Sequence, residues 1–180
     1  MIAGYRNPNR LFSAAVIGVL LMLVACAPGN VHMKAMVPEQ MDVVQQHTGS
    51  LMLEVNGGRD KHEMNLPQIP NATFLEALKA AIEKSRIFSS VSNAGPADYK
   101  LVAFIFNLNQ PMFINGDVSL EIAWTLTRGD TGAIVWQEAI TTTGTGIAAG
   151  SSSYNKRVAT EQAANKNIEA AIESLSKIDL

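Results

Sequence analysis

The stretch from Asp117 to Thr127 constrains the fold of this chain more than any other segment. Large apolar side chains occupy every second position there, and polar or small side chains occupy the positions between them. The apolar set consists of Val118, Leu120, Ile122, Trp124 and Leu126. Strict alternation is typical of a β-strand with one buried face. Because such a strand must bury that face against another layer, the rest of the chain has to supply the cover.

A turn and a returning strand follow this segment. Arg128-Gly129-Asp130-Thr131-Gly132 is rich in Gly and Asp, which supply the backbone geometry of tight turns. Residues 133–143 are predicted to form the returning strand, with Ile134, Trp136 and Ile140 on one face. A connection this short favours an antiparallel hairpin. Arg128-Gly129-Asp130 also spells an adhesion tripeptide, but the turn accounts for these residue types.

The remaining periodic segments supply a first strand, two helices and a central strand. Residues 51–55 alternate like a half-buried strand, and Thr73-x-x-Glu76 is a capping box that predicts a helix starting at Thr73. Residues 98–108 are so densely apolar that we expect a central strand with both faces largely covered. After the Gly- and Ser-rich loop 144–153, an apolar stripe predicts a long C-terminal helix. The order β-α-β-β-β-α predicts an α+β sandwich, with a mainly antiparallel sheet and both helices on one face.

The first 26 residues carry a signal of a different kind. Arg6 and Arg10 precede an apolar run, Leu11–Val24, which is shorter than the about 20 residues that span a membrane as a helix. A basic start, a short apolar core and small residues before a cleavage point are typical of a secretory signal peptide. Leu23-Val24-Ala25-Cys26 resembles the lipobox of bacterial lipoproteins, whose cysteine is lipidated and becomes the first mature residue. The resemblance implies a membrane anchor through lipid on Cys26.

These observations divide the chain into three parts. We expect a cleaved lipoprotein signal peptide at 1–25, a lipidated Cys26 with a flexible tether at 26–48, and a single α+β periplasmic domain at 49–180. Without the signal peptide, twelve basic and sixteen acidic residues remain, a net charge of −4 that argues against binding nucleic acid. Cys26 is the only cysteine, which excludes an intramolecular disulfide and a cysteine-based metal site.

No group of residues in the sequence has the spacing of a catalytic set or a metal site. The three histidines, His32, His47 and His62, share no helix face. Gly144-Thr145-Gly146-Ile147-Ala148-Ala149 fits a dinucleotide-binding pattern, but the helix does not begin at the glycines and no parallel strand follows it. We therefore expect no enzyme activity, no cofactor and no metal.

Four side chains are candidates for contact with a partner or ligand. Trp124 and Trp136 lie on the two strands that flank one turn, which can bring them to the same face of the sheet. Two interpretations stay open for this pair: core packing against the helices, or an exposed aromatic pair that binds a partner or a glycan. Tyr154 and Arg157, at the start of the last helix, can also contact a partner.

Several short motifs between residues 49 and 178 resemble a group of small bacterial envelope lipoproteins. The group includes YajG-like lipoproteins, penicillin-binding-protein activators of the LpoB kind, and domains like the N-terminal domain of TolB. The motifs are Phe74-Leu75-x-x-Leu78, Ile87-Phe88, Ala97-Asp98-Tyr99-x-Leu101, Trp124-x-Leu126, Thr131-Gly132-x-x-Val135-Trp136 and the alanine-rich final helix. The resemblance implies a non-enzymatic periplasmic domain that contacts another envelope protein. This chain lacks the long disordered linker of the activators.

The first functional hypothesis is thus an adaptor or accessory protein in cell-envelope assembly or maintenance. In lipoprotein families an aspartate after the lipidated cysteine is a common signal for retention in the inner membrane. Ala27 stands at this position, which favours the outer membrane, with the domain on its periplasmic face. A second hypothesis is a module that binds cell-wall glycan (peptidoglycan) or a lipid-like ligand through Trp124, Trp136 and the loop 144–153. A hydrolase is the third.

Overall fold

The computed structural model describes residues 31–60, 66–111, 117–147 and 151–180. The proposed signal peptide and Cys26 lie outside these residues. The elements, in chain order, are η1 (Met33–Met36), β1 (His47–Asn56), α2 (Asn71–Ser85), β2 (Phe88–Ser92), β3 (Tyr99–Asn109), β4 (Val118–Arg128), β5 (Ile134–Gly144) and α3 (Ser152–Leu175). In the part of the chain described, no helix is both long and apolar enough to cross a membrane.

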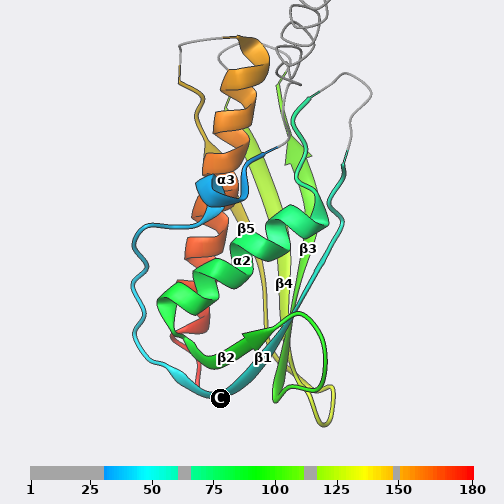
Figure 1. Ribbon diagram of the computed structural model, residues 1–180, viewed down its shortest axis with the longest axis vertical. Helices are drawn as coiled ribbons and strands as arrows, with labels where there is room; N and C mark the ends of the chain where they lie inside the picture. The colour runs from blue at the N-terminus through cyan, green and yellow to red at the C-terminus, as the bar shows by residue number, and fades with distance from the viewer. Residues whose placement is uncertain (1–30, 61–65, 112–116, 148–150) are drawn as a thin grey trace, which may run out of the picture.

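One five-stranded sheet forms the first layer, in the order β2-β1-β3-β4-β5. The predicted hairpin is confirmed, because β4 and β5 pair antiparallel, as do β3 and β4. These two ladders are the longest in the sheet, whereas β1 pairs parallel with both β2 and β3. The α+β class is therefore confirmed (Figure 1).

Strand β2 was not predicted. The sequence analysis expected no strand between the helix that starts at Thr73 and the strand at 98–108, but Phe88–Ser92 forms a short edge strand next to β1. Helix α2 lies between β1 and β2 in the chain and carries it back to the same end of the sheet, so that β2 runs parallel to β1. An edge strand of five residues, mostly Ser, gives no clear alternation, which explains why the pattern missed it.

Both helices lie on one face of the sheet, as predicted. A single β4 side chain shows this, because Trp124 contacts both of them. Its indole ring lies 6.2 Å from the ring of Phe74 on α2, and its Nε1–H donates a hydrogen bond of 2.9 Å to Asn167 on α3. Helix α3 runs along the strands and α2 crosses them obliquely (Figure 1).

The start of α2 differs from the prediction. The helix begins at Asn71, its N-cap is Pro70, and no side chain caps it, so the capping box at Thr73 is wrong. The extended backbone of Pro70 suits an N-cap, and the side-chain oxygen of Asn71 accepts a hydrogen bond of 2.7 Å from the backbone of Gly58. This contact with the turn after β1 fixes the start of the helix two residues earlier.

The flexible tether is also wrong for residues 31–48. Val31 and Met36 are buried, and η1 contacts both α2 and α3. His47 begins β1, and its ring nitrogen Nε2 lies 2.9 Å from the carbonyl oxygen of Leu175. The segment looks like a linker because its apolar residues follow no regular period. In the structure most of these apolar residues pack into the core, where η1 contacts both helices.

A buried asparagine joins α3 to the sheet. Asn167 is fully buried; it accepts the hydrogen bond from Trp124, and its Nδ2 donates to the carbonyl oxygen of Ile140 at 2.8 Å and to Oγ1 of Thr142 at 3.2 Å. All the polar atoms that meet at this point lie between the helix and two strands, so they depend on one another for hydrogen bonds.

We expect Asn167→Ala to lower the free energy of unfolding by about 2–4 kcal/mol, because it leaves the Trp124 N–H and the Ile140 carbonyl buried without partners. Urea unfolding followed by circular dichroism measures this change. Asn165→Ala is the matched control on the same helix; it removes only an exposed hydrogen bond to Ala35, and we expect less than about 1 kcal/mol. Equal losses in the two variants would contradict the central role of Asn167.

Candidate functional site

The predicted tryptophan pair belongs to the core. Trp124 is fully buried between the sheet and both helices, so it is not available to a partner or glycan. Trp136 lies opposite Leu126 in the β4–β5 ladder, on the helix side of the sheet, and is half-buried against the core. The two residues share a face, as predicted. Core packing is therefore the correct interpretation for Trp124.

The structure brings Tyr154 and Arg157 together on one side of α3. The guanidinium carbon of Arg157 lies 5.0 Å from the centre of the Tyr154 ring. Arg157 also donates a hydrogen bond of 2.8 Å to the buried carboxylate of Glu161, one turn further along the helix. The Glu161 carboxylate accepts a second hydrogen bond, of 2.8 Å, from the backbone N–H of His32. This row of side chains therefore holds the N-terminal segment against α3.

The glycines of two motifs are required by packing. A side chain at Gly144 would collide with the backbone of Ala159 on α3, and one at Gly129 would collide with the backbone of Ala97. Gly144 therefore lets α3 approach β5 closely, and Gly129 lets the β4–β5 turn contact the loop before β3. These contacts account for the dinucleotide-like and adhesion-like patterns.

The histidines do not form a cluster in the part of the chain that is described. His32 is exposed, His47 is buried against Phe88 and Leu175, and His62 lies outside the described residues. Among the described residues, no three His, Cys, Asp or Glu side chains stand close enough to hold a metal ion.

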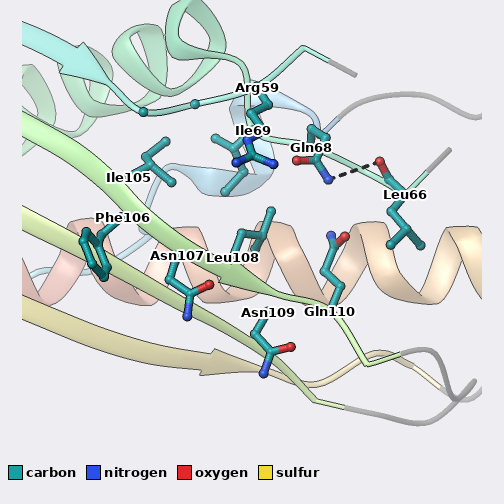
Figure 2. Close-up of a pocket in the computed structure, with 12 residues that line it drawn as sticks. Arg59, Leu66, Gln68, Ile69, Ile105, Phe106, Asn107, Leu108, Asn109 and Gln110 are labelled. Atoms are coloured by element: carbon teal, nitrogen blue, oxygen red, sulfur yellow. Dashed lines mark hydrogen bonds between the residues drawn. The ribbon is translucent and has the colours of Figure 1, made fainter. Parts of the chain in front are cut away.

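A cleft of about 300 Å³ lies beside the end of β3, at the low end of the volumes typical of ligand sites (Figure 2). It is formed by three segments that are distant in the sequence: 57–59, 66–69 and 105–110. Leu108 and Gln110 point toward Gln68 and Arg59, whereas Asn107 and Asn109 point away from them (Figure 2).

The polar groups inside this cleft are largely used by the protein itself. The side-chain amide of Gln110 donates hydrogen bonds to the carbonyl oxygen of Pro67 at 2.6 Å and to Thr160 at 2.9 Å. The amide of Gln68 donates to the carbonyl oxygen of Pro67 at 3.1 Å. The hydrogen bonds of Gln110 therefore hold the segment before α2 against the end of β3 and against α3. Few polar groups in the cleft remain for a ligand.

The other face of the sheet is the stronger candidate. The sequence analysis expected both faces of residues 98–108 to be covered, and this expectation is wrong. Phe104 is 45% exposed and Phe106 is 68% exposed, and both helices lie on the opposite face. The uncovered surface, here called the open sheet face, consists of Met52, Glu54, Asn56, Lys100, Val102, Phe104, Phe106, Asn107, Asn109, Ser119, Glu121, Ala123, Thr125, Thr127, Gln137, Ala139, Thr141 and Thr143.

The register explains why the two phenylalanine rings are exposed. Phe104 lies opposite Ala123 on β4, which in turn lies opposite Ala139 on β5, and these small side chains leave one side of the ring uncovered. Phe106 falls in an irregularity of the β3–β4 ladder between Ile105 and Asn107, so no β4 residue pairs with it. The predicted strand was right, but apolar density alone did not reveal which side chains would stay exposed.

A charged pair borders the aromatic side chains on the open sheet face. Lys100 and Glu54 are 2.6 Å apart, and the side chain of Asn56 donates a hydrogen bond of 2.7 Å to Glu54. Hydrogen bonds from Lys100 and Asn56 lower the pKa of Glu54 below its ordinary value of 4.5. The open sheet face therefore combines an aromatic centre with a polar rim, which is the arrangement of many protein interfaces.

Comparison with known proteins identifies the fold and not a family. The sequence matches no known protein family, and a search of curated proteins finds no relative either. Solved structures of similar fold include protein XCC0632 of Xanthomonas campestris, of family DUF330, with a TM-score of 0.62 and 13% identity over 78% of this chain and 91% of that one. Protein CT253 of Chlamydia trachomatis has a TM-score of 0.53 and 15% identity over 74% and 100% of the two chains.

A third similar structure comes from a protein of Caulobacter crescentus CB15 that is assigned as a lipoprotein. Its TM-score is 0.50, with 15% identity over 70% of this chain and 87% of that one. The fold of this chain is therefore one that occurs in a protein assigned to the bacterial lipoproteins. Membership of the YajG-like, LpoB-like or TolB-like groups is not tested by these structures and stays a prediction.

We expect Lys100→Met to raise the pKa of Glu54 toward its ordinary value, because the variant removes the largest cause of the shift. An NMR titration of the Glu54 carboxyl group measures the pKa. Since the folded-state pKa lies below the unfolded one, the interaction stabilises the fold above the unfolded pKa, and this contribution is lost as the pH falls through the folded-state pKa. Lys79→Met, which removes a partner of Glu83 on α2, is the control and should leave Glu54 unchanged.

Proposed function

We propose that this protein is a lipid-anchored accessory protein of the bacterial cell envelope and that it acts by binding another protein. The lipobox at Leu23–Cys26 supports the anchor, and Ala27 supports the outer membrane over the inner one. The fold, which also occurs in a protein assigned as a lipoprotein, is consistent with this location.

The observation that carries the proposal is the pair of exposed phenylalanines at the centre of the open sheet face. Burying a whole Phe side chain is worth about 1.5–3 kcal/mol, and more than half of Phe106 is exposed. Large apolar side chains next to each other on a surface mark sites of protein contact. A partner that presents its own apolar side chains to this face would bury both rings, and its polar groups could pair with Glu54, Asn56 and Lys100.

A non-enzymatic role is part of the same proposal. The cleft beside β3 is lined, among the described residues, by amides, backbone and apolar groups and by a single charged residue, Arg59. That lining supplies neither a nucleophile with an adjacent base nor a pair of carboxylates.

We expect the double variant Phe104→Thr, Phe106→Thr to lose its partner. After in-cell crosslinking and purification in mild detergent, recovery of the partner should fall at least about tenfold, because burial of two aromatic rings is lost. Threonine keeps a high β-propensity, and the rings are exposed, so the free energy of unfolding should change little.

Val44→Thr is the matched control, because Val44 is 70% exposed and lies outside the sheet. It should recover the partner as the unchanged protein does. If the double phenylalanine variant recovers the same partner in the same amount, the open sheet face is not the binding surface.

Glycan binding remains a second candidate, but its site moves from the tryptophans to the open sheet face. Phe106 stands next to two exposed amide side chains, Asn107 and Asn109, and an aromatic ring flanked by amides can stack on a sugar and bind its hydroxyl groups.

If this candidate is right, the double variant Asn107→Ala, Asn109→Ala should no longer sediment with purified cell wall. The control Asn93→Ala changes an exposed asparagine in the loop after β2 and should sediment normally. A protein that does not sediment with cell wall at all would exclude the glycan function and leave the protein partner.

A further inference from the structure

The point where the N-terminal segment meets the domain is fixed by buried contacts. Val31 is buried, the backbone N–H of His32 is bound to the carboxylate of Glu161 at 2.8 Å, and Met36 is fully buried. Because Glu161 also pairs with Arg157 on the same helix, this attachment point belongs to the body of the domain.

The segment between this point and Cys26 is short. Only residues 27–30 lie between Cys26 and Val31, and five Cα steps span at most about 18 Å when fully extended. Helix α3 begins at Ser152, about 14 Å along its axis before Glu161, and ends at Leu175, about 21 Å beyond it. A lipidated Cys26 can therefore lie level with the start of α3, but the end of α3 is beyond its reach.

The side chains at the start of α3 suit a membrane surface. Tyr154 is 41% exposed and stacks on Arg157, and Ile147 is 50% exposed. Gly146 packs tightly against the backbone of Asn155, which places Ile147 beside the first turn of the helix. Tyrosine is enriched at membrane interfaces, where its ring is buried and its hydroxyl group stays in water.

We propose that this end of the domain, with Ile147 and Tyr154 exposed on it, rests on the lipid surface of the membrane that holds Cys26. The inference depends on the lipid anchor of the proposed function. The β4–β5 turn then points away from the membrane, since Val118 and Gly144 pair near the start of α3 and Ile134 lies about 33 Å away at the other end of β5. The open sheet face stands beside the membrane and remains available to a protein.

Two isoleucines allow a matched test. Ile134 is 60% exposed, which is close to the value for Ile147; Ile134 begins β5, and Ile147 lies three residues beyond the other end of that strand. Cys26 is the only cysteine and is blocked by lipid, so a nitroxide label can be attached to Ile147→Cys or Ile134→Cys alone. The lipidated protein is placed in vesicles of phosphatidylethanolamine and phosphatidylglycerol, and collision of each label with a water-soluble nickel chelate is measured.

At Ile147→Cys we expect vesicles to reduce the collision rate several-fold relative to the same labelled chain in solution, made without residues 1–25 and with Cys26→Ser, and at Ile134→Cys we expect no change. If vesicles change the collision rate equally at both positions, or reduce it at Ile134→Cys, the inference is overturned. Protein partners are absent from this experiment, so the result does not depend on the open sheet face. A chain that fails to sediment with the vesicles would overturn the lipid anchor itself, and the orientation with it.

A longer tether tests the reach argument directly. Inserting twenty Gly and Ser residues between Ala27 and Pro28 keeps the anchor but gives a 24-residue tether with a root-mean-square span of about 27 Å. The label at Ile147→Cys should then return to its accessibility in solution. Shielding that persists unchanged would show that the short tether does not hold this end on the lipid.

Discussion

The fold depends on the burial of one indole ring and on the hydrogen bond that its nitrogen makes. Trp124 stands on β4, contacts α2 through Phe74, and donates to Asn167 on α3. Asn167 in turn donates to the carbonyl oxygen of Ile140 on β5. A bulky apolar group can be buried in several orientations, but an indole N–H that must find an acceptor fixes the position of α3 over the sheet. Both helices therefore pack on the face of the sheet that carries Trp124, and the other face remains uncovered.

The parts of the fold that the sequence predicted are those with a long, regular period. The alternation around Trp124 placed β4, and the stripe through Ile168, Ile172 and Leu175 placed α3, because each pattern extends over several turns or residue pairs. Strand β2 and the segment 31–46 were missed for the same physical reason. Neither has a regular apolar period, and each is held by contacts with distant segments, such as the one between His32 and Glu161.

The open sheet face could not be predicted from the pattern, because an apolar run does not say what will cover it. Residues 101–106 are dense enough in apolar side chains for a strand buried on both faces, and β3 is indeed an inner strand of the sheet. Yet both helices cover the same side, so Phe104 and Phe106 face outward beside Ala123 and Ala139. Apolar residues that exceed what the core needs are the sign of a binding surface, and they can be recognised only once the layers are known.

The proposed anchor and the open sheet face together limit where a proposed protein partner can bind. Because the strands run along α3, a domain whose α3 start rests on lipid holds the open sheet face roughly upright beside the membrane (Figure 1). Helix α3 spans about 36 Å, and the tether adds at most about 18 Å, so the face cannot move far from the membrane surface. A partner of the proposed kind would therefore bind at this membrane, as a protein resident in it or as one that reaches it from elsewhere in the envelope. The buried contacts of Val31 and Met36 make most of an apparent linker part of the domain, and the proposed function depends on the short tether that remains.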